Sequence, residues 1–258
     1  MKRKLSNDIL KEKYNLIYKK GAYEKYFTFN PFEILKSIID QQPSWKDLDV
    51  LDFGCGEGDL AAMLSFAGAK SVHAIDYSSE AIQISKKRIN LPNVKFELLD
   101  GKNITKKYNA IVMAGVLEHI DNPFKLLSKL VRKNLKKEGF IITASPSFMN
   151  PRGYVWMTLQ VLLNVPMSLS DIHFFSPTDF EKFAKKNKIK VETTTISHDW
   201  GGGRKTLLDY KKRLVNALSD AELDNKNVPK FLRWLEDSFK YYDHNELSGA
   251  IMITKLTN

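Results

Sequence analysis

From Leu48 onward the sequence alternates between short apolar runs and amphipathic helical patterns, and this alternation constrains the fold more than any other feature. The strand-like runs lie at 48–53, 71–76, 94–98, 110–114 and 140–144. The helical patterns lie between them, at about 58–68, 79–90 and 123–135. Strands that alternate with helices of this length form βαβ units, which build a parallel sheet through right-handed crossovers. The pattern therefore predicts an α/β fold with a doubly wound parallel sheet.

Other segments of the chain depart from this alternation. Residues 1–45 read as a helical lead-in rich in aromatic side chains, while 146–176 and 198–245 interrupt the later part of the pattern as insertions. The second insertion contains two amphipathic helical patterns, at about 204–218 and 228–242. We expect a single domain over residues 1–258, in which both insertions cover the substrate.

The remaining elements complete the predicted core. A helix is expected at about 177–187, because Ser176 can cap it and proline suits its first position. A threonine-rich strand follows at 189–196, and a last strand is expected at Ser248–Leu256. The core of the domain therefore spans 46–197 and 246–258.

The composition limits the classes of partner. The net charge is +10, but only seven of the 40 basic residues are arginine, and the lysines are scattered in short pairs. Because arginine is preferred for bidentate phosphate and base contacts, this pattern disfavours a nucleic-acid groove. The one cysteine, Cys55, excludes an intramolecular disulfide and a multi-cysteine metal site. The first residues are charged, and no window approaches a membrane span of roughly 18 apolar residues, so a cytoplasmic setting is expected.

A glycine loop follows the first predicted strand and opens the next helix. Gly54, Gly56 and Gly58 lack a Cβ, which allows a sharp turn and a close approach to a ligand. Their spacing differs from the dinucleotide-binding pattern, and no Walker lysine follows them. The acidic side chains Asp52 and Glu57 would repel a pyrophosphate but suit a cationic or hydroxyl-rich ligand. A purely structural turn is the alternative interpretation.

Polar groups also follow the next three strands, at the same edge of the predicted sheet. Asp76 comes at the end of the second strand, Asp100 and Gly101 follow the third, and the segment 113–119 ends the fourth. In open α/β sheets, ligands bind at this edge, outside the carboxyl ends of the strands. The Asp76 carboxylate can accept hydrogen bonds from both ribose hydroxyls of an adenosine. Capping of the following helix is the alternative role for Asp76.

The order of these motifs resembles the class I S-adenosylmethionine-dependent methyltransferases. Over roughly residues 45–145 the chain reads Val-Leu-Asp-Phe-Gly-Cys-Gly-Glu-Gly, then Ile-Asp-Tyr-Ser, Leu-Leu-Asp-Gly and Val-Leu-Glu-His-Ile-Asp-Asn-Pro. The resemblance implies a Rossmann-like, seven-stranded and mostly parallel sheet with an antiparallel last strand. It also implies S-adenosylmethionine as the cofactor and S-adenosylhomocysteine as the product, with no metal.

The same resemblance implies a set of cofactor-binding residues. The loop after the first strand would bracket the methionine part of the cofactor, Asp76 would take the ribose hydroxyls, and the residues after the third strand would face the adenine. The implied contacts are Asp52, Gly54, Cys55, Gly56, Asp76, Tyr77, Asp100, Gly101, Ala114 and Leu117.

Three histidines are candidates for a catalytic base or a contact with the methyl acceptor. His119 adjoins the end of the fourth strand, where the resemblance implies the methyl group; helix capping or packing is its alternative role. His173 lies in the first insertion, and His198 lies at a strand end beside the second. A positioned histidine can take the proton of an acceptor during transfer. His73 is expected to be structural and His244 to lie on the surface.

The acceptor class follows partly from motifs that the sequence lacks. There is no Asn/Asp-Pro-Pro-Tyr/Phe tetrapeptide of the kind used on exocyclic amines of bases, no Pro-Cys nucleophile, and no histidine–carboxylate cluster for a catechol-type metal site. We therefore expect a small-molecule acceptor such as a sugar, a glycan precursor or a secondary metabolite, with O-methylation favoured over N-methylation.

Several alternatives stay open. The segment 152–166 is apolar, contains Trp156 and is flanked by Arg152, and it resembles an excursion of the ubiquinone-pathway O-methyltransferases. Peripheral contact with the inner face of the membrane through this segment is an alternative to packing over the pocket or in a dimer. A membrane-surface quinone or lipid O-methyltransferase, an RNA methyltransferase and a non-catalytic cofactor-binding scaffold are the alternative functions. The oligomeric state is left open.

Overall fold

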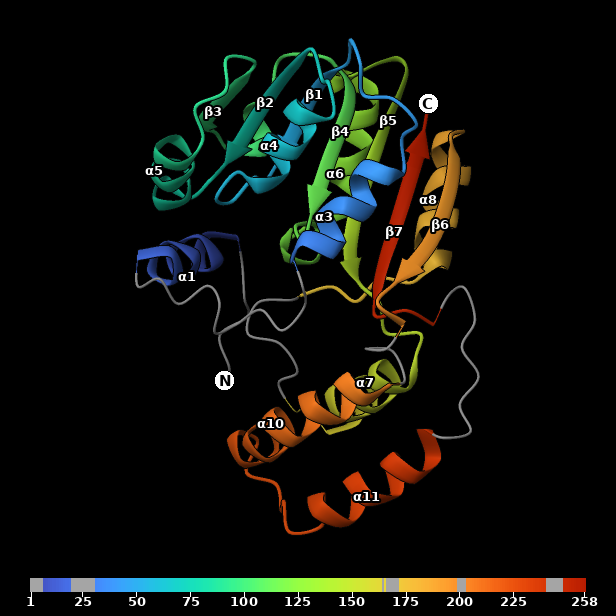
Figure 1. Ribbon diagram of the computed structural model, residues 1–258. Helices are drawn as coiled ribbons and strands as arrows, with labels where there is room; N and C mark the ends of the chain where they lie inside the picture. The colour runs from blue at the N-terminus through green and yellow to red at the C-terminus, as the bar shows by residue number, and fades with distance from the viewer. Residues whose placement is uncertain (1–6, 20–30, 164, 166–171, 199–202, 240–247) are drawn as a thin grey trace. The chain divides into compact units, whose positions relative to one another are not determined.

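The computed structural model describes residues 7–19, 31–163, 165, 172–198, 203–239 and 248–258 (Figure 1). The first half of the chain forms α1 (Asn7–Lys19), α3 (Pro31–Asp40), β1 (Asp49–Phe53), α4 (Asp59–Phe66), β2 (Ser71–Asp76), α5 (Ser79–Arg88), β3 (Val94–Leu98), η1 (Gly101–Asn103), β4 (Tyr108–Ala114), η2 (Leu117–His119) and α6 (Pro123–Lys129). The second half forms η3 (Leu130–Asn134), β5 (Leu135–Pro146), α7 (Pro151–Leu163), α8 (Pro177–Asn187), β6 (Lys190–Ile196), α10 (Arg204–Asp220), α11 (Val228–Ser238) and β7 (Ile251–Thr257).

The seven strands form one sheet in the order β3-β2-β1-β4-β5-β7-β6. The pairs β1–β2, β2–β3, β1–β4 and β4–β5 are parallel. Strand β7 runs in the opposite direction to β5, as Figure 1 shows. This arrangement confirms the predicted doubly wound sheet with an antiparallel last strand. The strand order reverses between β1 and β4, and in folds of this kind ligands bind at such a switch point.

The register of the central strands brings the predicted motifs to one edge. Asp52 on β1 pairs with Ala74 on β2 and with Val112 on β4. Because all three strands are parallel, their carboxyl ends meet at the same edge of the sheet. The glycine loop after β1, Asp76 at the end of β2 and the segment after β4 are therefore neighbours in space.

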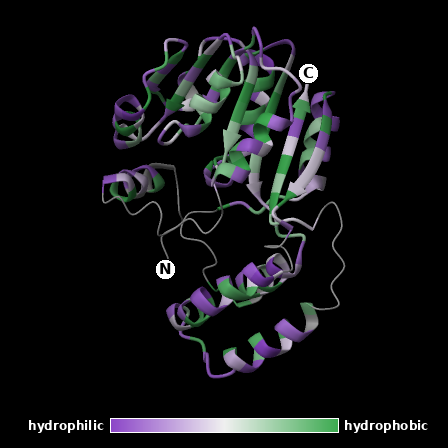
Figure 2. Cartoon of the chain, in the orientation of Figure 1, coloured by the Kyte–Doolittle hydropathy of each residue, from purple (hydrophilic) through white to green (hydrophobic). Residues whose placement is uncertain are grey.

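The central strands are apolar because helices cover both faces of a parallel sheet. Val50, Leu51, Ile111 and Val112 are fully buried. Figure 2 shows β4 and β5 coloured as hydrophobic, in contrast to the mixed colours of the helices. The continuous apolar runs in the sequence thus reflect burial on two sides rather than on one.

Two core elements differ from the sequence-based expectation. Strand β5 begins at Leu135 rather than near residue 140, with Glu138 in a left-handed conformation (φ 60°) and a shift of register between Tyr108 and Ala110. The charged side chains at 136–138 resemble a turn in the sequence, so they hide the start of the strand. The helix predicted at about 123–135 is present as α6 followed directly by a π-helical turn, η3, so the difference lies only in the hydrogen-bond pattern of its last turn.

The chain divides into two compact units, which we describe separately. The first contains residues 1–145, 177–193 and 253–258, and the second contains 146–176 and 194–252. In the second unit, residues of α7, α10 and α11 pack around a common core that includes Trp156, Tyr210 and Leu214. Both predicted insertions contribute to this second unit. That they cover the substrate stays a prediction.

A buried ion cluster lies within the second unit. The Asp209 carboxylate accepts hydrogen bonds from Nε of Arg152 (3.3 Å), from Nε1 of Trp156 (3.3 Å) and from the Arg213 guanidinium (3.0 Å). The hydroxyl of Tyr210 donates to the Arg152 carbonyl at 2.6 Å. The contacts of Arg152 and Trp156 with Asp209, and of Tyr210 with Arg152, tie α7 to α10 through buried groups.

The side chains that suggested a membrane contact are the ones in this cluster. Trp156 is 0% exposed and Arg152 is 5% exposed, so both point into the core of the second unit. The exposed large apolar side chains among the described residues of α7 are others, Tyr154, Val161 and Leu163. Among the described residues, no helix is long and apolar enough to cross a membrane. Peripheral contact through 152–166 stays a prediction that depends on these three exposed side chains.

Candidate functional site

A cavity of about 1510 Å³ lies at the carboxyl ends of β1, β2 and β4, and all of its lining residues belong to the first unit. The loops after β1, β2, β3 and β4 contribute to its walls, together with α1, the end of α5, and α6 with η3. Nine of the ten cofactor contacts implied by the sequence line it. The exception is Leu117, which is fully buried; its neighbour Val116 lines the cavity instead.

The glycine loop is held against the end of β2 by its own backbone. The N–H groups of Gly54 and Cys55 both donate to the carbonyl oxygen of Ile75, at 2.8 and 2.9 Å. Gly54 has a φ of +77°, and a Cβ added there would lie 2.6 Å from Cγ2 of Val116. The loop therefore needs glycine at this position, because a side chain would meet both a left-handed conformation and a close neighbour.

Asp76 organises the loop from the neighbouring strand. One carboxylate oxygen accepts a hydrogen bond from the Gly56 N–H at 3.0 Å, and the other accepts one from the Ser78 N–H at 2.8 Å. The helix α5 is capped by the Ser78 hydroxyl, which accepts from the Ala81 N–H. Capping of the helix is therefore the role of Ser78, while Asp76 holds the loop and lines the cavity. Burial raises the pKa of Asp76.

Asp52 is the most unusual group of the site. Its side chain is 2% exposed, and its Oδ2 atom is buried without a hydrogen-bond partner among the described residues. Burial, followed by the negative charge of Asp76, raises the pKa of Asp52 from 3.8 to about 8. A buried carboxylate oxygen beside a second carboxylate favours a cationic or hydrogen-bond-donating ligand, because such a group would satisfy both.

Cys55 and Glu118 have structural rather than chemical roles in this region. The Cys55 side chain is buried, and burial raises the pKa of its thiol, which keeps it protonated and unreactive. Glu118 is buried and accepts a hydrogen bond from the Ser145 hydroxyl at 3.0 Å, which ties η2 to β5.

The cavity wall formed by α1 could not be foreseen from the sequence motifs. Tyr14 and Tyr18 of this helix line the cavity, and the Tyr14 hydroxyl lies 3.1 Å from Nε2 of His119. Asn15 accepts a hydrogen bond from the Ser78 hydroxyl at 2.6 Å. The aromatic richness of the lead-in was the only signal, and it did not indicate where these rings pack.

The three candidate histidines are divided between the two units. His119 lines the cavity of the first unit. His173 and His198 belong to the second unit and are not among the residues that line this cavity. His173 stacks on Phe175 and has a buried Nε2 atom without a hydrogen-bond partner in the described part of the chain; His198 lies 3.4 Å from the Ser248 hydroxyl. Their catalytic roles stay predictions.

The two other histidines were expected to be structural and on the surface. His73 lies between the Tyr108 hydroxyl, 2.5 Å from its Nδ1, and Glu97, 3.1 Å from its Nε2. This bonding within the sheet is a structural role. His244 lies outside the described residues. In the part of the chain that the structure describes, no group of three or more histidine, cysteine or acidic residues could hold a metal ion.

Comparison with known proteins assigns the chain to a family. Residues 24–193 match a family model described as a methyltransferase domain, which is well over half of the chain. The protein is an S-adenosylmethionine-dependent methyltransferase. The predicted family and enzyme class are thereby confirmed.

Individual relatives of this methyltransferase are distant. A ubiquinone biosynthesis O-methyltransferase of Pelagibacter ubique is 27% identical over 223 residues, which cover 76% of this chain and 90% of that protein. The enzyme of the same name from Neisseria meningitidis is 22% identical over 187 residues, covering 68% and 77%. The crystal structure of an S-adenosylmethionine-dependent methyltransferase from Mesorhizobium loti has a TM-score of 0.54 and 11% identity, covering 86% and 96%, which shows the shared fold.

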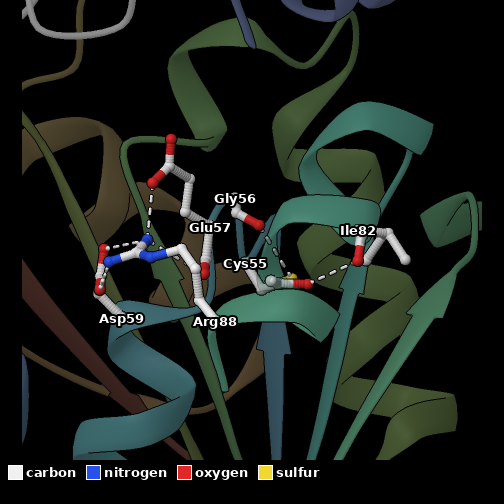
Figure 3. A network of polar contacts seen from close by, with 7 residues as sticks. Cys55, Gly56, Glu57, Asp59, Ile82 and Arg88 are labelled. Carbon is white, nitrogen blue, oxygen red and sulfur yellow. Dashed lines mark hydrogen bonds and ion pairs between the residues drawn. The ribbon is translucent and has the colours of Figure 1, made fainter. Parts of the chain in front are cut away.

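The glycine loop of the methyltransferase is also clamped from outside. Figure 3 shows the Arg88 side chain, from the last residue of α5, lying between Glu57 and Asp59. Its guanidinium donates to Glu57 Oε2 at 2.6 Å and to Asp59 Oδ1 at 2.9 Å. Because Gly58 lies between these two acidic residues, the clamp restrains the loop and the first turn of α4 together.

We expect replacement of Arg88 with alanine to weaken binding of S-adenosylmethionine by about 5-fold, because the loop would lose restraint in the unbound protein. Arg88→Lys should restore part of the affinity, since lysine keeps the charge but lacks the planar fork. Calorimetric titration measures the effect. Lys87→Ala, in the same turn of α5, is the control and should leave the affinity unchanged; equal losses in both variants would contradict the clamp.

Proposed function

We propose that S-adenosylmethionine binds in the cavity of the first unit and that its methyl group is transferred to an oxygen of a small-molecule acceptor. The observation that carries this proposal is the Oδ2 atom of Asp52, which is buried beside Asp76 and the glycine loop and has no hydrogen-bond partner in the described part of the chain. A carboxylate in that state suits a cationic, hydroxyl-rich ligand. S-adenosylmethionine combines an ammonium group with two ribose hydroxyls, so the residues present fit it.

The other implied contacts would bind successive parts of the cofactor at the ends of successive strands. Asp52 and the loop from Gly54 to Gly56 would hold its methionine part, and Asp76 would accept from the ribose hydroxyls with its remaining lone pairs. Tyr77, Asp100 and Gly101 would surround the adenine. Ala114 and the following turn would face the sulfonium. When bound, S-adenosylmethionine supplies an electrophilic methyl group.

His119 would take the proton of the acceptor hydroxyl, and Tyr14 would hold the His119 ring in place. The His119 ring is held at one nitrogen by the Tyr14 hydroxyl, at 3.1 Å, and it packs edge-on against the Tyr14 ring with centroids 5.7 Å apart. Two contacts on one ring fix its orientation, which general base catalysis requires. Attack of an acceptor hydroxyl on a methyl group releases one proton, and His119 lies at the cavity wall where it could take it.

A quinone-related phenol is the second candidate for the acceptor. The observation that favours it is the likeness to ubiquinone biosynthesis O-methyltransferases, at 22 and 27% identity. Exposed apolar side chains in the second unit, such as Tyr154, Leu208 and Trp234, would suit a lipid-bearing acceptor or a membrane surface. A sugar, a glycan precursor or a secondary metabolite is the first candidate, in keeping with the charged side chains among the residues that line the cavity.

Titration with S-adenosylmethionine and S-adenosylhomocysteine tests the cofactor site. We expect Asp76→Asn to weaken binding about 30-fold, because a charge-assisted hydrogen bond contributes about 2 kcal/mol. Asparagine keeps the shape of the side chain and can accept from one backbone N–H. The matched control is Asp40→Asn, which removes an exposed carboxylate that pairs with Lys36 on α3. No binding to the wild-type protein, or equal losses in the two variants, would refute the proposed site.

Methyl transfer to an acceptor tests the role of His119. Acceptors should be screened in two sets, phenols with and without a prenyl chain, and sugars with free hydroxyls. With any acceptor that is methylated, His119→Ala should lower kcat about 100-fold while leaving the affinity for S-adenosylmethionine within 2-fold, as expected for a general base. Turnover that is unchanged in this variant would assign His119 a packing role.

A further inference from the structure

A stripe of positive charge lines one end of the cavity. It consists of Lys125 and Lys129 on α6 and of Arg132 and Lys133 on η3, all four of which line the cavity. Their spacing places them on one side of a continuous helical segment. We call these four residues the basic stripe. Lys129 donates from Nζ to the Gly101 carbonyl at 3.1 Å, which places the stripe beside the loop after β3.

Most of the basic stripe lacks compensation by acidic groups. Lys125, Arg132 and Lys133 are exposed and form no ion pair or hydrogen bond with any described residue. In contrast, Arg88 in the same lining is paired with Glu57 and Asp59. Two acidic residues of the same lining adjoin the stripe: Asp121 lies four positions before Lys125, and Asp100 precedes the Gly101 whose carbonyl Lys129 contacts. Two carboxylates thus stand against four cations.

The local backbone also sets this segment apart. Leu130–Asn134 forms a π-helical turn directly after α6. Such turns are rare, and they occur frequently at functional sites. Like charges at neighbouring positions of one helical face repel each other and destabilise the helix. Positive charges gathered in a concave surface attract anions and raise their local concentration.

The cavity has room for a second ligand beside the cofactor. Its volume of about 1510 Å³ exceeds the roughly 300–1,000 Å³ of ordinary small-molecule sites. The carboxylates Asp52 and Asp76, at the ends of β1 and β2, suit the cationic and hydroxyl groups of the proposed cofactor. The basic stripe has the opposite charge and cannot serve those groups.

We infer that the basic stripe binds a phosphate or carboxylate group of the methyl acceptor, so that the acceptor of this methyltransferase is an anionic small molecule. This inference rests on the proposed function, in which Asp52 and Asp76 contact the cofactor in the same cavity. Lysine and arginine side chains converging from one helical segment are the ordinary means of holding such a group.

The test compares two triple variants that lose the same charge. Lys125→Gln, Arg132→Gln and Lys133→Gln remove the unpaired cations of the stripe and leave Lys129, which bonds to the backbone. Lys182→Gln, Lys185→Gln and Lys186→Gln remove three exposed lysines of α8 that do not line the cavity. Inorganic pyrophosphate is the probe, titrated calorimetrically at low salt into each protein saturated with S-adenosylhomocysteine. Melting temperatures show that each variant is folded.

We expect the stripe variant to lose pyrophosphate affinity about 10-fold or more, while the α8 variant changes less than 2-fold and both bind S-adenosylhomocysteine like the wild type. Equal losses in the two variants would overturn the inference, because net charge alone would explain them. Binding of a 20-nucleotide single-stranded RNA that outcompetes pyrophosphate and depends on the stripe would also overturn it, in favour of a nucleic-acid acceptor. Failure of S-adenosylhomocysteine to bind the wild-type protein would refute the proposed function instead.

Discussion

We expect replacement of Asp52 with asparagine to raise the free energy of unfolding, by an amount that grows by about 2–4 kcal/mol between pH 5 and pH 8. The unfolded chain releases the proton of Asp52 near its ordinary pKa of 3.8, whereas burial and the charge of Asp76 raise the pKa to about 8 in the folded protein. Between these values the folded state holds one more proton than the unfolded state. Stability therefore falls as the pH rises through this window, by up to about 1.4 kcal/mol per pH unit.

Asparagine removes this dependence because it is neutral in both states. Its side-chain oxygen can still accept the hydrogen bond that the backbone N–H of Ala61 makes to Asp52. Urea-induced unfolding of both proteins at pH 5 and pH 8, followed by circular dichroism, gives the free energies of unfolding. A stability difference between the two proteins that stays constant with pH would show that Asp52 ionises normally in the fold.

Asp49→Asn on the same strand is the control. The hydrogen bond from Lys136 lowers the pKa of Asp49 below its ordinary value, so this carboxylate is ionised in both states over pH 5–8. Its contribution to stability is present above the unfolded pKa and is lost only as the pH falls through the folded pKa. The variant should therefore differ from the wild type by the same amount at pH 5 and pH 8.

Replacing Asp209 with alanine should cost about 3–5 kcal/mol of stability, because it leaves the buried guanidinium of Arg152 without its counter-charge. Asp209 is fully buried in its side chain and accepts hydrogen bonds from Arg152, Trp156 and Arg213. The loss should concentrate in the second unit. Hydrogen exchange of the α7 and α10 amides should rise before that of β1 and β4.

Two further variants make the Asp209 prediction specific. Asp220→Ala removes an exposed carboxylate at the end of the same helix and should change stability by less than about 0.5 kcal/mol. The double variant Arg152→Met with Asp209→Leu removes both charges and should be more stable than Asp209→Ala, because no buried charge is left unpaired. An equal effect of the Asp209 and Asp220 replacements would contradict the buried cluster.

Much of the core could be predicted because its signals are local and repeat along the chain. Strands β1, β2 and β4 are largely apolar, and a glycine or an acidic residue ends or follows each of them, as at Gly54, Asp76 and Gly115. These positions indicated the edge of the sheet at which the cavity lies. The glycine loop and Asp76 lie where this pattern puts them. Leu117 does not line the cavity, because it lies in the irregular turn η2, where Val116 faces the cavity instead.

Other features depend on contacts between distant segments and could not be predicted. Tyr14 and His119 meet across 105 residues of sequence, and no pattern near Tyr14 identifies a ligand site. Trp156 and Arg152 looked like an interfacial anchor because their buried partner, Asp209, lies more than 50 residues away. The start of β5 was missed because it carries charged residues, of which Lys136 pairs with the distant Asp49 at 2.6 Å.

A crystal structure of the protein with S-adenosylhomocysteine bound tests the central claim most directly. The account predicts the ligand in the cavity of the first unit, with its amino group within hydrogen-bond distance of Asp52 Oδ2 and its ribose hydroxyls on Asp76. A ligand bound elsewhere, or one that leaves Oδ2 of Asp52 buried and without a partner, would contradict the proposed cofactor site.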